Sequence, residues 1–185
     1  MNKKRVTILV IIAVIVIAVA SFIVLNQNHQ NIQTRNFTIG SLAPNYGFLL
    51  YNGSSVNLSA WRGHLTVLWF VATWCSTCAQ GDEALNQNYQ FFKQRGIKIV
   101  ELELYKDLGY QGPSIESMVN SYAPDAFSNG TIIPALAGYN ITAAYDPKGY
   151  LDIYYLLSSD GKVLYINGSL AFTLGQLEQA INASV

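Results

Sequence analysis

The chain has 185 residues with 11 basic and 11 acidic side chains, so its formal net charge is +0 and only 12% of its residues are charged. This balance leaves no basic surface, which excludes nucleic-acid binding as the main function. The length allows one domain of about 150 residues beside shorter segments.

The N-terminal segment predicts a membrane anchor. A basic cluster at residues 3–5 precedes an almost unbroken apolar run over residues 6–25, and about 20 helical residues span a bilayer core. Ala18-Val19-Ala20 resembles the cleavage site of a signal peptide, but the apolar run continues past it, so we favour an uncleaved anchor. The basic cluster stays in the cytoplasm. We therefore expect residues 1–25 to fix a single-pass protein in the cell membrane, with the rest of the chain outside.

Beyond the anchor the sequence predicts a polar linker over residues 26–38 and one domain over residues 39–185. Apolar periodicity in the domain indicates both strands and helices. In chain order we first expect strands at 46–51 and 55–58 around an Asn52-Gly53 turn, a strand at 65–71, a helix at 79–95 and a strand at 97–104. A helix opened by Pro113 and reaching 122, a strand at 131–136 and one or two helical turns at 141–145 should follow. The chain should end with a hairpin of strands at 151–157 and 162–166 and a helix at 173–181. This order predicts an α/β fold with a mixed sheet and helices on both faces.

The two cysteines lie three residues apart in Trp74-Cys75-Ser76-Thr77-Cys78. This motif joins the apolar strand to the helix, where unpaired backbone N–H groups and the helix dipole stabilise a thiolate. Cys75 is expected at the helix entry, with Cys78 one turn further in and more buried. That arrangement suits attack by Cys75 on a substrate disulfide and resolution of the mixed disulfide by Cys78.

Two other interpretations of the cysteine pair are open. A structural disulfide is one, although a bridge between residues three apart restricts the unfolded chain little. A zinc site is the other, although it needs about four ligands, and only His29 and His64 are available as histidines.

Asn-x-Ser/Thr sequons indicate N-glycosylation of an exported domain. Chance predicts about two of them, and an alternative is that Asn, Ser and Thr simply gather in turns. We expect an archaeal or eukaryotic glycoprotein, with archaeal as the working expectation. None of the sequons lies between Gly63 and Phe127, so we expect the face with the cysteines to be free of sugar. The sequons begin at Asn36, Asn52, Asn57, Asn129, Asn140, Asn167 and Asn182.

The outer domain resembles the thioredoxin superfamily and, within it, the membrane-anchored TlpA-like thiol–disulfide oxidoreductases. The resemblance covers residues 39–182, includes the Trp61-Arg62-Gly63 stretch, and is most specific over residues 67–78. It implies a thioredoxin-like three-layer fold with a mixed central sheet flanked by helices, preceded by an N-terminal β-hairpin and one transmembrane helix.

The resemblance also implies roles for the motif residues. Cys75 is the nucleophile, Cys78 resolves, and Trp74 packs beside the disulfide, while Ser76 and Thr77 help to set the redox potential. The only redox group is the Cys75–Cys78 disulfide, without a cofactor or metal. The implied partners are exported cysteine-containing proteins and a redox partner in or outside the membrane.

Three departures from the family pattern concern the surroundings of the cysteines. Leu151 stands where the family has a cis-proline, so the groove predicted at Tyr150 and Leu151 is reshaped. A cis bond costs about 2.5–4 kcal/mol without proline, so we expect a trans peptide before Leu151. The pair between the cysteines also lacks the proline found in many members.

The third departure concerns a buried carboxylate. Gly81 and Trp69 occupy the two positions where relatives place one as a proton acceptor. Asp82 and Glu83 lie nearby, and we interpret both as favourable charges in an early helical turn.

These observations favour an extracytoplasmic thiol–disulfide oxidoreductase acting on exported proteins. The missing proline and carboxylate motivate one alternative, a thioredoxin-like binding module with little turnover. A copper-handling thiol protein is another alternative, although His64 precedes the strand. A peroxidase is disfavoured because the chain lacks a Pro-x-x-x-Thr-x-x-Cys motif.

Overall fold

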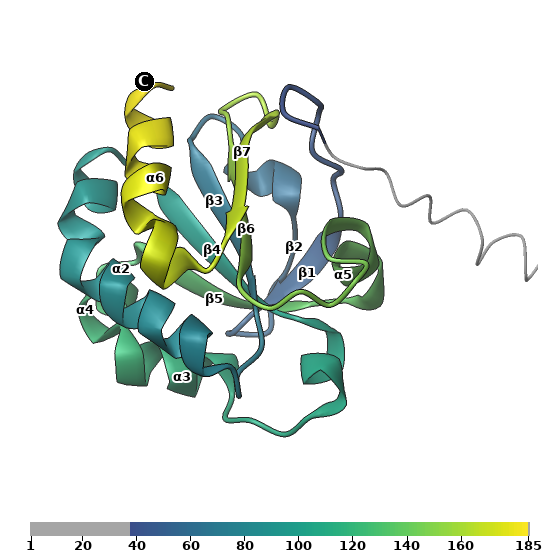
Figure 1. Ribbon diagram of the computed structural model, residues 1–185. Coiled ribbons are helices and arrows are strands. Elements are labelled where there is room, and N and C mark those ends of the chain that lie inside the picture. The colour runs from purple at the N-terminus through teal and green to yellow at the C-terminus, as the bar shows by residue number, and fades with distance from the viewer. Residues whose placement is uncertain (1–37, 185) are drawn as a thin grey trace, which may run out of the picture. The chain divides into compact units, whose positions relative to one another are not determined.

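The computed structural model describes residues 38–184, which form one seven-stranded sheet covered by helices (Figure 1). The strands are β1 (Gly47–Leu50), β2 (Ser55–Asn57), β3 (Thr66–Val71), β4 (Lys98–Glu103), β5 (Ile132–Ala137), β6 (Ile153–Leu157) and β7 (Val163–Gly168). The helices are α2 (Ser76–Gln94), α3 (Ile115–Tyr122), α4 (Pro124–Ser128), α5 (Tyr139–Tyr145) and α6 (Leu170–Asn182), with 3-10 turns η1 (Leu58–Trp61) and η2 (Tyr105–Gly109).

The predicted anchor over residues 6–25 and the sequon at Asn36 lie outside the described residues. Within residues 38–184, no helix combines the length and the apolar character needed to cross a membrane.

The sheet is mixed, as the sequence predicts. Its strand order is β2-β1-β5-β4-β3-β6-β7. The neighbours β3, β4 and β5 run parallel, whereas β6 pairs antiparallel with β3, and β1 pairs antiparallel with β5. The three parallel strands therefore end at the same edge of the sheet, which we call the carboxyl edge. The predicted β1–β2 and β6–β7 hairpins are both present.

Strand β3 lies in the interior of the sheet, between β4 and β6, and every one of its six residues is buried. Such a continuous apolar run is typical of a strand covered on both faces. Val67, Trp69 and Val71 belong to the core on one face, and Leu68 and Phe70 belong to the core on the other.

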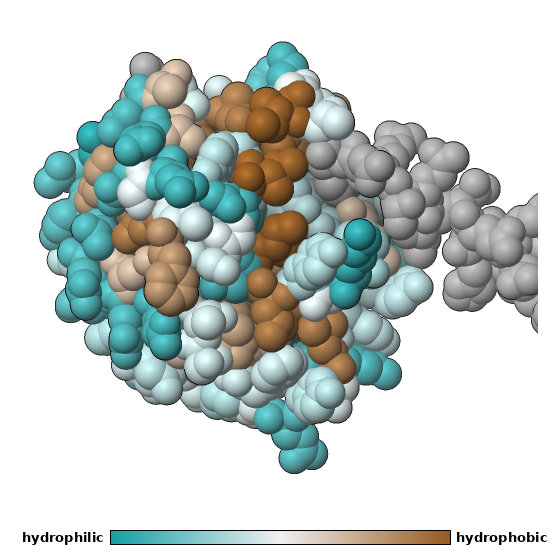
Figure 2. Space-filling model, viewed as in Figure 1, coloured by the Kyte–Doolittle hydropathy of each residue, from teal (hydrophilic) through white to brown (hydrophobic). Residues whose placement is uncertain are grey.

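The helices form two outer layers around the sheet (Figure 1). Buried residues of α2, α3, α4 and α6 pack in the core with Trp69, whereas buried residues of α5 and η1 pack in the core with Phe70. The expected three-layer arrangement with helices on both faces is therefore confirmed. Hydrophobic side chains also reach the surface near the edge strand β7 (Figure 2), where Leu164 and Ile166 are half-buried.

Four helices begin at positions different from those predicted. Helix α5 starts at Tyr139 and α6 at Leu170, two and three residues earlier than expected. Helix α2 starts at Ser76, three residues earlier than expected, because Cys75 caps it. Helix α3 starts at Ile115, because the Ser114 side chain accepts a hydrogen bond from the Ser117 N–H (3.2 Å) and acts as its N-cap. Pro113 thus precedes the helix and is not its first residue.

Candidate active site

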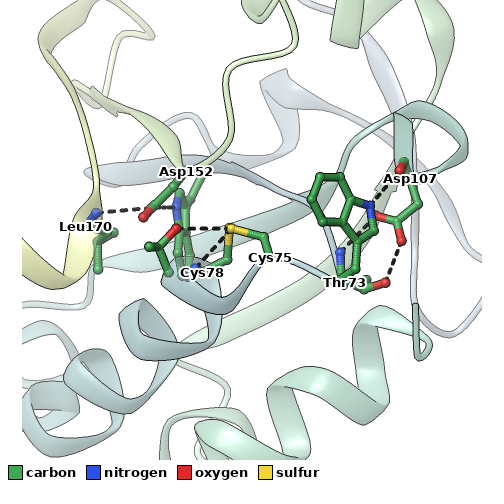
Figure 3. The surroundings of a disulfide bond; sticks show 9 residues. Thr73, Cys75, Cys78, Asp107, Asp152 and Leu170 are labelled. Carbon is green, nitrogen blue, oxygen red and sulfur yellow. Dashed lines mark hydrogen bonds between the residues drawn. A yellow bond between two sulfur atoms is a disulfide. The ribbon is translucent and has the colours of Figure 1, made fainter. Parts of the chain in front are cut away.

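The two cysteines form a disulfide at the N-terminus of α2, at the carboxyl edge (Figure 3). Their Cα atoms lie 5.3 Å apart. Cys75 is the N-cap residue, and its Sγ accepts a hydrogen bond from the Cys78 N–H at 3.2 Å. The same N–H group and the helix dipole would stabilise a thiolate at Cys75 after reduction.

The two sulfurs differ in access, as the sequence predicts. Cys75 keeps 5% of its surface exposed, whereas Cys78 has 0%. Between them, Ser76 is exposed and Thr77 is half-buried, with its Oγ1 3.2 Å from Cys75 Sγ. The Thr77 hydroxyl is therefore placed to donate a hydrogen bond to a thiolate at Cys75. An incoming substrate can reach only Cys75.

An aspartate that the sequence analysis missed holds the loop before the cysteines. Asp107 Oδ1 accepts a hydrogen bond from the Thr73 N–H (2.8 Å), and its Oδ2 accepts one from Thr73 Oγ1 (2.7 Å). The Trp74 indole N–H donates to the Asp107 carbonyl oxygen (2.9 Å). Figure 3 shows Asp107 and Thr73 beside the disulfide. These bonds fix the backbone from which Cys75 projects.

The turn that carries Asp107 has a strained backbone. Lys106, Asp107 and Leu108 have φ values of 52°, 52° and 57°, in the left-handed region that costs about 1–2 kcal/mol per residue. No sequence signal marks three such residues in a row. The bonds from Thr73 and Trp74 offset this cost, so the turn and the active-site loop depend on each other.

Trp74 and Tyr110 form an aromatic contact beside the cysteines. Their ring centroids lie 4.8 Å apart, and the two side chains are 38% and 67% exposed. The resemblance implies that Trp74 packs beside the disulfide, and the structure shows what fixes its ring, namely Asp107 and Tyr110. Two exposed aromatic rings next to Cys75 suit contact with an extended substrate segment.

Gly81 and Trp69 are in contact with each other. These are the two positions where relatives carry a buried carboxylate. A Cβ added to Gly81 would lie 2.7 Å from Trp69 Cζ2, so the Trp69 ring occupies the space beside the helix. The Trp69 indole N–H donates to Asp152 Oδ1 (2.8 Å), and the Leu170 N–H donates to the same oxygen (3.0 Å). Figure 3 shows Asp152 and Leu170 on the side of the disulfide opposite Asp107.

Tyr150 and Leu151 lie at the carboxyl edge, just before β6. The peptide bond before Leu151 is trans, as expected, because the described residues contain no cis peptide bond. Leu151 is half-buried and packs against both cores, whereas Tyr150 is 56% exposed. Asp152, the next residue, has a φ of 65°. The chain thus turns at Asp152. The cis-proline of the family pattern would stand one residue earlier, at the position of Leu151.

Two further acids are buried between α2 and the sheet. Asp82 and Glu101 are both 0% exposed. Burial, partly offset by a hydrogen bond with Glu101, raises the pKa of Asp82 to about 7, and burial together with the charge of Asp82 raises the pKa of Glu101 well above its usual value. The interpretation of Asp82 as a favourable charge in an early helical turn is therefore wrong, because burial disfavours its charged form. Glu83 is exposed. Glu101 was missed, although an acid between the apolar residues Val100 and Leu102 is a recognisable signal.

The sequons are spread over both ends of the domain. The exposed ones are Asn52, Asn57, Asn129, Asn140 and Asn182, and Asn167 is half-buried. Strands β5 and β7 run parallel to β3, so Asn140 and Asn167, which follow or end these strands, lie at the carboxyl edge with the cysteines. The gap in the sequence between Gly63 and Phe127 therefore does not leave the whole carboxyl edge without sequons.

Within residues 38–184, no group of three or more His, Cys, Asp or Glu side chains is arranged to hold a metal ion.

Comparisons with known proteins identify relatives of this domain. The model of the AhpC/TSA family matches residues 39–151. The thiol-disulfide oxidoreductase ResA of Bacillus anthracis is 28% identical over 129 residues, covering 68% of this chain and 67% of the relative. A secreted Mycobacterium tuberculosis disulfide oxidoreductase, homologous to E. coli DsbE, superposes with a TM-score of 0.55 at 19% identity, covering 75% of this chain and 95% of that one. A thiol:disulfide interchange protein from Bacteroides sp. gives 0.54 at 19% identity, covering 77% and 91%. The two structural likenesses establish a shared fold.

Proposed function

The chain belongs to the AhpC/TSA family, and we propose that it exchanges disulfides with exported proteins outside the cytoplasm. It is a thiol–disulfide oxidoreductase with a thioredoxin-like fold, similar to the ResA proteins, and its redox group is the Cys75–Cys78 disulfide. One observation carries the proposal: Cys75 caps α2 through its sulfur and keeps 5% of its surface exposed, while Cys78 behind it has 0%.

The geometry supports a two-step exchange. The thiolate of reduced Cys75 attacks one sulfur of a substrate disulfide, a Cys75–substrate bond forms, and the other substrate sulfur leaves as a thiolate. Cys78 then attacks Cys75 Sγ, the Cys75–Cys78 bond forms, and the second substrate thiolate leaves. Two electrons have then passed from the cysteine pair to the substrate, and the reverse sequence oxidises a substrate dithiol.

Sequence features support the extracytoplasmic site of action. The basic cluster at residues 3–5 and the apolar run over residues 6–25 would anchor the chain in the cell membrane with its N-terminus inside. Exposed sequons such as Asn52 and Asn129 are accessible to a glycosylation enzyme. In this arrangement the domain meets exported cysteine-containing proteins and a redox partner in or outside the membrane.

Turnover of a protein disulfide tests the activity. We expect the reduced protein to cleave the insulin disulfides, Cys75→Ser to be inactive, and Cys78→Ser to accumulate a stable mixed disulfide through Cys75. Wild-type protein no faster than Cys75→Ser would refute the exchange activity. Partner binding that persists in the Cys75/Cys78 double variant, without trapping by Cys78→Ser, would instead indicate a binding module.

Two further measurements test the compartment and the direction. Protease added to intact cells should degrade the domain, and the native mass should exceed that of the bare chain by the attached sugar. A fully protected domain with the bare mass would refute the placement outside. A reduction potential near about −270 mV would indicate a reductant, and one near about −120 mV an oxidant.

A further inference from the structure

Asp82 and Glu101 are acids that the two-step exchange does not yet use. Both side chains are completely buried, one on α2 and the other on β4. The two carboxyls lie close enough to shift each other's pKa. No N–H or O–H group of any other described residue donates to their four oxygens. An isolated buried carboxylate is very costly, so the two groups are stable together only if they share a proton.

The pair lies one helical turn behind the resolving cysteine. Asp82 follows Cys78 by four residues on α2, which places the two side chains on one helix face with Cβ atoms about 5–6 Å apart. Helical side chains lean toward the N-terminus, so the Asp82 side chain leans toward the turn that carries Cys78. Cys78 itself is 0% exposed. Bulk water therefore cannot take the proton of its thiol directly.

The wall around the pair is apolar and fixed. Trp69 is the β3 partner of Glu101 in the sheet register, so the two side chains stand next to each other on the same face. The Trp69 ring fills the space beside Gly81 and is held by its hydrogen bond to Asp152. The position that a carboxylate would take at residue 81 or 69 is thus closed. The buried acids on this side of the disulfide are Asp82, Glu101 and Asp152, and Asp152 holds Trp69 and the start of α6 through its Oδ1.

The charges around Asp82 keep the pair ready to accept a proton. The acids that act on it are Glu101 on β4, Asp152 before β6 and Glu83 on its own helix. Burial and the repulsion from Asp152 and Glu83 raise the pKa of Asp82 to about 7, while the hydrogen bond from Glu101 lowers it. Near neutral pH, protonated Glu101 donates to Asp82, and ionised Asp82 has room for one more proton.

We propose, on the basis of the proposed disulfide exchange, that Asp82 and Glu101 form a proton-accepting pair that takes the thiol proton of Cys78 during resolution. The Cys78 S–H bond breaks, and its proton moves to Asp82, directly or through one water. The Cys78 thiolate attacks Cys75 Sγ, the Cys75–Cys78 bond forms, and the substrate sulfur leaves with the electron pair of the broken bond. The pair later returns the proton to solvent.

A two-stage chemical probe separates this step from the first attack. The reduced full-length protein reacts with dithiobis(nitrobenzoate), which releases one coloured thiolate when Cys75 attacks and a second when Cys78 resolves. Asp82→Asn should leave the first release unchanged and slow the second at least about tenfold at neutral pH, because a general base contributes about 10²–10⁴-fold. Glu116→Gln, which changes an exposed acid on α3, is the matched control and should behave as wild type.

The pH profile distinguishes a proton acceptor from a structural role. In the wild type the second release should rise through about pH 7, following Asp82. In Asp82→Asn it should rise only where an ordinary thiol ionises, near about pH 8.5, and approach the wild-type rate above that. Glu101→Gln gives a second test: its amide cannot hold the shared proton, so the pH at which the second release rises should differ from that of the wild type.

Each outcome bears on a different claim. A second release with the wild-type rate and profile in both Asp82→Asn and Glu101→Gln would overturn the proposal. An equal slowing at every pH, including alkaline pH, would also overturn it, because it would indicate a structural effect. If even the wild type releases no second thiolate, the proposed exchange itself fails.

Discussion

The contact between Gly81 and Trp69 predicts opposite effects for the same substitution at two helical glycines. A Cβ at Gly81 would lie 2.7 Å and 2.8 Å from two atoms of the Trp69 ring, whereas a Cβ at Gly175 on α6 would meet nothing within 4 Å. Gly to Ala in a helix interior stabilises by about 1 kcal/mol when there is space. Gly175→Ala should therefore raise the free energy of unfolding by about that amount.

Gly81→Ala should bring the same gain in helix stability, but it adds a steric cost. Trp69 is fully buried and tied to Asp152 by a 2.8 Å hydrogen bond, so its ring cannot move away cheaply. Overpacking of a dense core costs about 1–3 kcal/mol. With a rigid ring we expect the upper half of this range, which leaves Gly81→Ala about 1–2 kcal/mol less stable than wild type after the helical gain of about 1 kcal/mol.

Urea unfolding of the full-length protein measures both variants under one condition. A double-mutant cycle with Trp69→Phe identifies the cause, since Gly81→Ala should cost at least about 1 kcal/mol less beside the smaller phenyl ring. The reasoning fails if Gly81→Ala is as stabilising as Gly175→Ala, or if its cost is the same in the wild-type and Trp69→Phe backgrounds.

Two further predictions concern the acids around the cysteines. Asp107→Ala removes both hydrogen bonds to Thr73 and leaves Ala at a φ of 52°, so urea unfolding should show a loss of about 2–4 kcal/mol. Asp107→Asn, which keeps one bond and tolerates that φ, should lose clearly less, and equal losses would contradict the role given to Asp107. The second prediction concerns pH: the folded pKa of Asp82 is raised from 3.8 to about 7, so its contribution to stability is fully present below about pH 4 and is lost as pH rises toward 7. The free energy of unfolding should fall by up to about 1.4 kcal/mol per pH unit in this window, and a slope in Asp82→Asn equal to that of wild type would refute it.

The sequence predicted the fold because its main signals are local. The uniform apolar run of β3 can only be a covered strand, and the spacing of Cys75 and Cys78 at its end places them at a helix start. Hairpins and crossovers then leave few ways to order the strands. The short α4 was missed because five residues give no usable periodicity.

The surroundings of the cysteines were harder to predict because they depend on contacts between distant segments. Asp107 meets Thr73 across 34 positions, and Asp152 meets Trp69 across 83. From the sequence, Glu101 is one polar residue of a strand. Only the strand register shows that it lies beside Trp69, on the face covered by α2. Exposure of Asp82 could not be judged without knowing which face of α2 meets the sheet.

The departures from the family pattern around Trp69 are parts of one change. An indole at position 69 needs the side-chain-free surface of Gly81, and its buried N–H needs an acceptor, which Asp152 provides. Asp152 also accepts from the first N–H of α6 and adopts a positive φ, a backbone that aspartate tolerates better than most residues and proline cannot adopt. A carboxylate restored at Gly81 alone would therefore collide with Trp69. Replacement of Trp69 alone would leave Asp152 buried with one donor fewer, so these three positions must change together.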